Sequence, residues 1–166
     1  MSIKKEKYKE AIIYLCSHLN NEVRGKKKLA KLLYFVDFDL FESEEKVLTG
    51  DVYKAFPMGP FPQTMEQITS ELEQENAISI ETIETIESIL DYNPTEVYKC
   101  KRQPDISIFE SDEIKILDRV IKKYGHLNGK QLEDLTHAEA PYVGTEAFQE
   151  IPYELAYYRG TDFTND

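Results

Sequence analysis

Hydrophobic residues recur every three to four positions along most of the chain. The first such stripe consists of Ala11, Ile12, Leu15, Cys16 and Leu19. Because this spacing places side chains on one face of a helix, it predicts a helix that ends near Asn20-Asn21.

A second stripe predicts the most buried helix of the protein. Its members are Leu29, Leu32, Leu33, Val36 and Leu40, and it is broadened by Phe35, Phe38 and Phe41. A helix that is apolar around so much of its circumference is typical of the middle of a core. We therefore expect residues 28–41 to form a central helix.

The helical period is lost in three stretches. Residues 46–62 (KVLTGDVYKAFPMGPFP) combine strand-favouring side chains with three prolines, which forbid a continuing helix. Alternating hydrophobic residues near 78–80 and in 96–101 (EVYKCK) indicate further short strands. We expect one small antiparallel sheet built from residues 50–56, 77–83 and 96–101, with a turn at residues 91–94 (DYNP).

The remaining segments predict further helices. A third helix is expected from Gln63, a fourth is capped by Ser111 and stopped by Gly125, and a fifth has a capping box of Asn128 with Gln131. A last short helix is expected over residues 152–158, followed by a fraying tail at 160–166. The predicted fold class is therefore α+β, predominantly α-helical, with five to six helices in a single domain of residues 1–166 and a core from about residue 8 to 158.

Size and composition fit one globular domain. The 166 residues are 41% hydrophobic and 31% charged, with a net charge of -11. A field of that sign repels phosphate, so we expect no direct nucleic-acid binding. No apolar run approaches the roughly 18 residues that span a bilayer, and no apolar stretch follows the charged N-terminus as in an export signal. A cytoplasmic protein without membrane contact is expected.

The charge is distributed unevenly. Residues 1–31 carry nine of the 20 basic residues and only three of the 31 acidic ones. We call residues 1–31 the basic head. A solvated helix face followed by a basic loop explains its excess of positive charge. The alternatives are a docking patch for an acidic partner and an intramolecular partner for the acidic remainder.

The sequence contains little that indicates catalysis. Cys16 and Cys100 have no ligand at zinc spacing and are expected to be small core residues, with a disulfide between them as the alternative. Motifs for nucleotide binding, zinc proteolysis and serine hydrolysis are absent, and we expect no cofactor. Of the three histidines, His137 is the only candidate acid or base, although a histidine at a helix end more often caps carbonyl groups.

Three segments in this order resemble a known family. They are residues 28–41 (KLAKLLYFVDFDLF), 49–62 (TGDVYKAFPMGPFP) and 135–142 (LTHAEAPY). Together they resemble the Panacea domain of SocA-like antitoxins and phage-associated proteins, with its K-L-x-K-L-L-Y-F helix, Y-x-x-x-x-x-G-P turn and T-H-x-x-x-P-W ending. Tyr142 stands where the family usually has Trp, and Ala30 where Gln is common. Tyr142 keeps an aromatic ring with a polar tip, so a packing role could survive.

The resemblance implies an antitoxin of a bacterial or prophage toxin–antitoxin system. Such a protein binds and neutralises a cognate toxin, or in some members presents it to a protease, and the toxin's identity is not encoded in the motif. The motif residues suit either a core or a shared partner surface. We expect the surface to comprise Lys31, Tyr34, Tyr53, Met58 and His137 as exposed members, together with Gly59, Pro60 and Tyr142.

Two other functions stay open from the sequence. One is a phage or prophage accessory protein that binds a host factor with the same fold. The other is an enzyme that uses His137 with a nearby carboxylate, which requires a concave pocket around that side chain. For a toxin partner, the basic head with residues 49–62 and the acidic regions 71–87 and 105–118 are the alternative first contacts.

Overall fold

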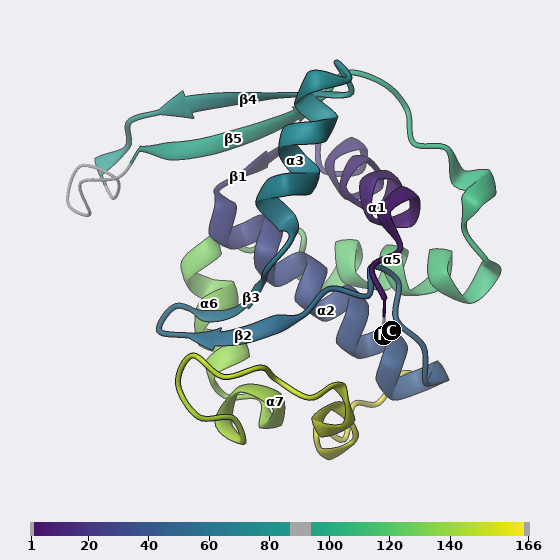
Figure 1. The fold of residues 1–166 in the computed structure, drawn as a ribbon, viewed down its shortest axis with the longest axis vertical. Coiled ribbons are helices and arrows are strands. Elements are labelled where there is room, and N and C mark those ends of the chain that lie inside the picture. The colour runs from purple at the N-terminus through teal and green to yellow at the C-terminus, as the bar shows by residue number, and fades with distance from the viewer. Residues whose placement is uncertain (1, 87–93, 165–166) are drawn as a thin grey trace.

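One long central helix organises the protein in the computed structural model, which describes residues 2–86 and 94–164. This helix, α2 (Lys26–Glu44), crosses the middle of the molecule in Figure 1, and every residue from Leu29 to Phe41 is buried. The prediction from the broad apolar stripe is therefore confirmed. The buried stretch also includes Lys31, Asp37 and Asp39, whose polar groups need internal partners.

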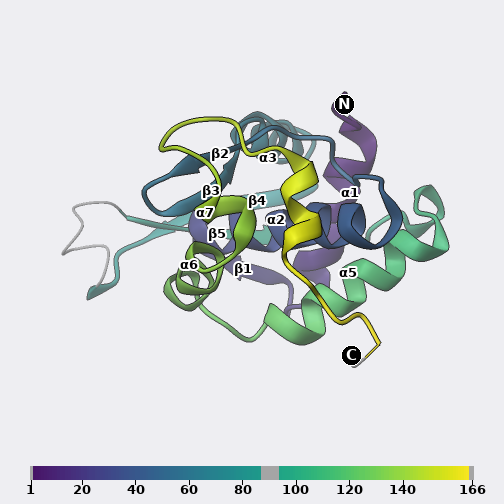
Figure 2. The same cartoon turned by 90° about the horizontal axis from the view of Figure 1, so that it is seen from below.

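The other helices pack around α2. They are α1 (Lys5–Ser17), α3 (Met65–Gln74), α5 (Ser111–Tyr124), α6 (Gly129–His137) and the short α7 (Ala140–Val143), with 3-10 turns η1 (Ile106–Ile108) and η2 (Tyr153–Tyr158). Helices α5 and α6 contact α2 directly, and Figure 2 shows η2 lying across α2 next to α7. None of these helices, within the described part of the chain, is long and apolar enough to cross a membrane.

The strands form two separate sheets instead of the single sheet expected. Strand β5 (Thr95–Cys100) lies between β1 (Glu22–Arg24) and β4 (Ile78–Ile83) in an antiparallel sheet. Strands β2 (Tyr53–Phe56) and β3 (Gly59–Pro62) form a hairpin of their own. The expected place of residues 50–56 in the first sheet is therefore taken by β1, whose three residues are too few to show an alternating pattern.

The α+β class is confirmed, while several boundaries differ from the prediction. The third helix begins at Met65 rather than Gln63, and the N-cap of α5 is Glu110 rather than Ser111, because Glu110 and Glu113 form a capping box. The predicted box of Asn128 with Gln131 is present. Of the expected turn at residues 91–94, positions 91–93 lie outside the described residues.

The chain after Gly160, which the sequence predicts to fray, contacts the rest of the fold through Thr161 and Phe163. The Thr161 backbone N–H donates a hydrogen bond of 2.8 Å to a Glu42 carboxylate oxygen on α2. Phe163 packs against the core, with the Arg119 guanidinium 4.6 Å from its ring centroid. The sequence of this short polar tail does not indicate these contacts, because Glu42 and Arg119 lie far from it along the chain.

Candidate functional site

Lysine 31 joins the central helix to the β2–β3 hairpin. Its side chain is buried, and its ammonium donates a hydrogen bond of 2.9 Å to the Pro60 carbonyl. Burial lowers the pKa of Lys31 to about 7, because water no longer stabilises the charged form; the nearby Glu133 opposes this and Lys27 adds to it. The hairpin is thus fixed to the core by a buried amine.

Glycine 59 makes this close approach possible. Its φ of +108° suits glycine alone, and a Cβ atom built there would lie 2.8 Å from Lys31 Cε and 3.0 Å from Thr136 Oγ1. Thr136 is fully buried on α6 and donates its hydroxyl hydrogen to the Glu133 carbonyl. The three segments that resemble the family, residues 28–41, 49–62 and 135–142, therefore meet at Gly59.

The third segment holds the hairpin from the other side. The rings of His137 and Tyr142 are stacked with centroids 4.6 Å apart, and the Tyr142 hydroxyl donates a hydrogen bond of 2.6 Å to the Phe56 carbonyl. The Nε2 atom of His137 is buried and has no hydrogen-bond partner among the described residues. His137 therefore packs beside the hairpin, and no carboxylate in the described part of the chain is hydrogen-bonded to it to orient it for proton transfer.

The hydroxyl groups of Tyr53 and Tyr8 hold two carboxylates at the base of the hairpin. Tyr53 donates to Asp37 at 2.6 Å, and Tyr8 donates to Asp51 at 2.6 Å. Burial raises the pKa of Asp37, although Thr49 and Tyr53 counteract this through hydrogen bonds. These contacts order the segment that leads from α2 into β2.

A buried arginine fixes the carboxylate that accepts a hydrogen bond from Tyr34. Arg159 forms ion pairs with Asp39 at 2.8 Å, Glu42 at 2.9 Å and Glu139 at 3.0 Å, and the Tyr34 hydroxyl donates to Glu139 at 2.8 Å. The expected exposure of Lys31, Tyr34 and Tyr53 is therefore wrong. Each side chain is buried because a distant segment supplies a partner for its polar atom.

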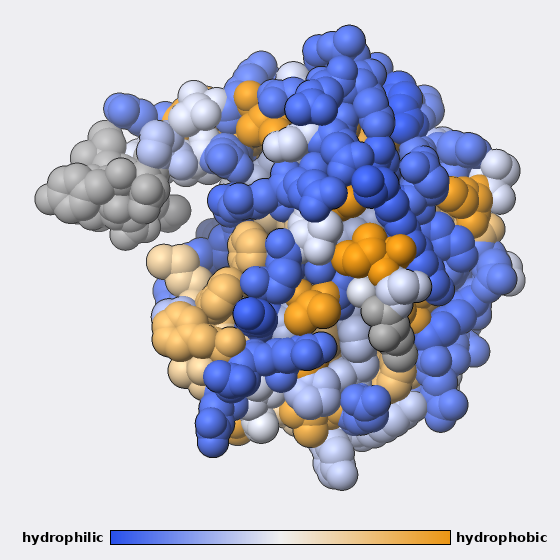
Figure 3. All heavy atoms as spheres, in the orientation of Figure 1, coloured by the Kyte–Doolittle hydropathy of each residue, from blue (hydrophilic) through white to orange (hydrophobic). Residues whose placement is uncertain are grey.

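The outer face of the hairpin carries the exposed apolar residues. Met58, at the turn, is 56% exposed and Phe148 is 58% exposed. The Phe56 ring lies 6.1 Å from that of Phe61 and 5.9 Å from that of Phe148. We call Phe56, Met58, Phe61 and Phe148 the hairpin face. Figure 3 shows apolar side chains gathered over this part of the molecule.

Sequence reasoning singled out Met58 of this face, included Phe56 and Phe61 only within residues 49–62, and missed Phe148. Phe56 and Phe61 resemble ordinary strand residues in sequence, and Phe148 lies in a segment with no helical or strand period. The strand alternation is the signal that could have found Phe56, because Tyr53 and Ala55 alternate with it and point inward.

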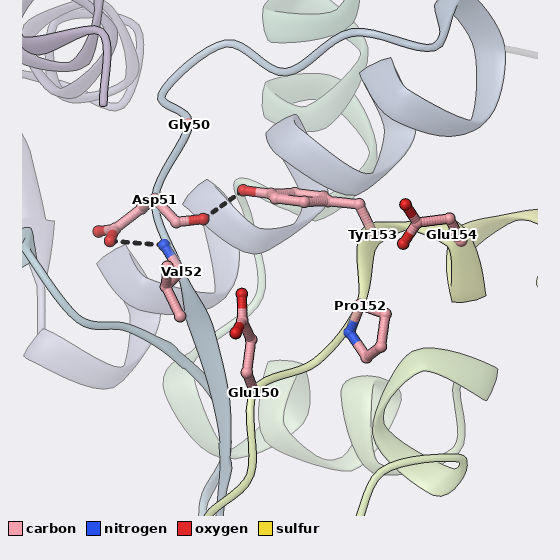
Figure 4. A pocket seen from close by; sticks show the side chains of 7 residues that line it. All are labelled: Gly50, Asp51, Val52, Glu150, Pro152, Tyr153 and Glu154. Carbon is pink, nitrogen blue, oxygen red and sulfur yellow. Dashed lines mark hydrogen bonds between the residues drawn. The ribbon is translucent and has the colours of Figure 1, made fainter. Parts of the chain in front are cut away.

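The surface formed by the described residues includes two shallow hollows. One, of about 340 Å³, adjoins the start of β2 and is lined by Asp51, Val52, Glu150, Tyr153 and Glu154 among others (Figure 4). The second, of about 450 Å³, lies between the end of α1 and α5 and includes His18 and His126. His137 lines neither of them.

The remaining chemistry-bearing residues form no metal site in the described part of the chain. No group of three or more His, Cys, Asp or Glu side chains there is placed to hold a metal ion. Cys16 and Cys100 are free thiols, and the Cys100 N–H donates to Cys16 Sγ at 3.1 Å. Burial raises the pKa of the Cys16 thiol to about 12, which disfavours the reactive thiolate.

All nine basic residues of the basic head have internal acceptors. Six form ion pairs with acidic side chains, namely Lys5–Glu71, Lys7–Glu113, Lys9–Glu75, Arg24–Glu22, Lys26–Glu66 and Lys27–Glu133. Three donate to backbone carbonyls, namely Lys4 to Val47, Lys28 to Gly125 and Lys31 to Pro60. These contacts fit best with the explanation that the basic head pairs with acidic residues and carbonyl groups of the same chain. They fit less well with a docking patch for an acidic partner or a purely solvated face.

Comparison with known proteins agrees with the convergence of the three segments on one hairpin. The family described as "Antitoxin SocA-like, Panacea domain" matches residues 29–142, which include Lys31, Gly59, His137 and Tyr142. No curated protein and no solved structure matches the chain. Because the match covers more than half of the chain, this protein belongs to the SocA-like Panacea domain antitoxin family.

Proposed function

We propose that this protein is a non-enzymatic antitoxin that binds a cognate toxin protein in the cytoplasm and neutralises it by direct contact. Membership of the antitoxin family supports the general role. One structural observation carries the direct-contact mechanism: the motif residues use their polar groups to fix the hairpin, while Met58 and Phe148 of the hairpin face stay exposed. A rigid platform with an exposed apolar surface suits protein binding.

The partner-binding residues of this proposal differ in their access to a partner. Met58 of the predicted set lies on the surface and would touch the toxin. Lys31, Tyr34, Tyr53, Gly59, Pro60 and Tyr142 would act from below, by holding the hairpin in its binding shape. His137 would support Tyr142 through ring stacking.

Catalysis by His137 has weaker support. A general acid or base needs a substrate within hydrogen-bond reach, in a pocket that excludes water. The His137 ring instead stacks on Tyr142, and neither hollow includes it. His137→Phe, which keeps an aromatic ring beside Tyr142 but carries no acid or base, is expected to leave neutralisation intact.

Co-expression tests the proposal. The product of the neighbouring reading frame is expressed with and without this protein, and growth, toxin level and co-purification are recorded. Direct neutralisation predicts restored growth, an unchanged toxin level and a stable complex. Restored growth with a toxin level that falls only when cellular proteases are intact would mean delivery to a protease. Growth arrest in the presence of the protein, with no complex, contradicts the antitoxin role and leaves binding of a host factor.

A further inference from the structure

We propose that the hairpin face and the acidic hollow beside it form one docking surface for a basic, apolar segment of the partner, with an Arg or Lys side chain of that segment in the hollow. The inference rests on the proposed function, because it specifies the surface and the chemistry by which the toxin would be recognised.

The hairpin face, the apolar half of this surface, includes a residue whose backbone conformation is energetically unfavourable in the isolated protein. Phe148 adopts a φ of +68°, a left-handed conformation that is unfavourable for a bulky residue, and the residue is 58% exposed. The Phe148 N–H donates a hydrogen bond of 2.7 Å to the Ala55 carbonyl, which seats the ring beside Phe56. Strained backbone that exposes an aromatic side chain is typical of a functional site.

The hairpin face is also held rigidly from below. Lys31 binds the Pro60 carbonyl, and Tyr142 binds the Phe56 carbonyl. Along the outer edge of β2, Ala55 donates its N–H to the Gln149 carbonyl at 3.0 Å. Because this backbone is already ordered, the hairpin would lose little conformational entropy when a partner binds.

The acidic hollow adjoins this face at the start of β2. In Figure 4 the Glu150 carboxylate points toward the space between Val52 and Tyr153, and Glu154 lies at the rim beyond Tyr153. Within the described residues, neither Glu150 nor Glu154 has a hydrogen bond or ion pair from its carboxylate. The backbone of Glu150 is bridged to that of Lys54 on β2, so the hollow and the hairpin face share one strand.

The negative net charge of the chain favours a basic partner segment at this surface. The net charge is -11, and every basic residue of the basic head already has an internal acceptor. The field around the surface therefore steers a basic segment toward it. A second copy of this chain fits poorly, because a symmetric contact through the same surface would bring the carboxylates of Glu150 and Glu154 near their own copies.

The first test uses a synthetic peptide as the probe and does not need the toxin. A short peptide of phenylalanine, leucine and arginine is titrated into the isotope-labelled protein, beside a counterpart with glutamate in place of arginine. The proposal predicts that the basic peptide shifts backbone amide signals in residues 53–61 and 148–154, and that the acidic one does not. Shifts centred elsewhere, or equal effects of both peptides, would overturn it.

Two variants separate binding from folding. Phe148→Gly removes the ring and relieves the left-handed strain, so the fold should be retained while peptide affinity falls about tenfold or more. Glu150→Gln combined with Glu154→Gln should weaken binding of the basic peptide and reduce its dependence on salt. Ile106→Ala is the matched control, because Ile106 is 55% exposed on η1, away from the hairpin.

The same variants keep this inference distinct from the proposed function. If the protein neutralises the toxin and Phe148→Gly does so equally well, the surface is wrong and the antitoxin role stands. If the basic peptide binds the predicted surface and the protein neutralises nothing, the role is wrong and the surface chemistry stands. Concentration-dependent dimers that Phe148→Gly abolishes would make a second copy the occupant and overturn the proposal.

Discussion

The ammonium of Lys31, inside the central helix, donates a 2.9 Å hydrogen bond to the carbonyl of Pro60 in the β2–β3 hairpin. These two residues are 29 positions apart, and both lie within the range that matches the family. The contact explains how a lysine can stand on the most buried helix of the protein. It also makes the hairpin's position sensitive to the ionisation of one amine.

The stability of the protein should therefore rise with pH above neutrality. The pKa of Lys31 is lowered to about 7 from an ordinary value of 10.5, so the folded state binds fewer protons than the unfolded state between these values. Stability contributed by this group then increases with pH, by at most about 1.4 kcal/mol per pH unit. Denaturation at several pH values between about 7 and 9 should show this slope in the wild type and lose it in Lys31→Met.

Substitution of Gly59 should be strongly destabilising. Gly59→Ala combines an unfavourable φ with a clash against Lys31 Cε, so we expect a loss of about 2–4 kcal/mol in the free energy of unfolding. Gly160→Ala is the matched control, because Gly160 also has positive φ but has nothing within 4 Å of its Cβ position. Its loss should be only about 1 kcal/mol. Equal losses in urea denaturation would show that the approach to Lys31 is unimportant.

Tyr142→Phe isolates the hydrogen bond from α7 to the hairpin. Loss of the 2.6 Å contact with the Phe56 carbonyl should lower the free energy of unfolding by about 0.5–1.5 kcal/mol. Tyr158→Phe should change it little, because the Tyr158 side chain is largely exposed. Thermal denaturation of both variants provides the comparison, and an unchanged Tyr142→Phe would mean that ring stacking alone fixes the hairpin.

Arg159 should be among the residues most sensitive to substitution. Arg159→Met leaves three carboxylates, those of Asp39, Glu42 and Glu139, without their shared partner, and we expect a loss of about 3–5 kcal/mol. Arg159→Lys should rescue it only in part, since an ammonium cannot serve three separate carboxylates in the same geometry. The exposed pair of Arg24 with Glu22 offers the control: Arg24→Ala should cost about 1 kcal/mol or less.

The predictable parts of the structure are those with a local periodic signal. The stripe around Leu33 identified the central helix because its hydrophobic residues recur at helical spacing over about three turns, from Leu29 to Leu40. Strand β1 was missed because three residues carry no period. The pairing of β2 with β3 was missed because the prolines of residues 57–62 indicate a turn as readily as an edge strand.

Several of the predicted site residues lie together around the β2–β3 hairpin, but their burial could not be predicted from the sequence. Lys31, Tyr34 and Tyr53 are polar or amphipathic, and such residues are usually exposed at least at their tips. Here Pro60, Glu139 and Asp37 accept their hydrogen bonds from distant parts of the chain, which no local pattern reveals. Phe148 shows the opposite case, an aromatic residue that remains exposed because its backbone is fixed to Ala55.

A reconstitution with purified proteins tests direct neutralisation most directly. The activity of the neighbouring gene's product is measured while this protein is added up to and beyond equimolar amounts, with the Phe148→Gly variant in parallel. The account predicts that wild-type protein abolishes the activity near one equivalent and that the variant requires a marked excess. Full toxin activity at a large excess of wild-type protein, in the absence of any protease, would contradict it.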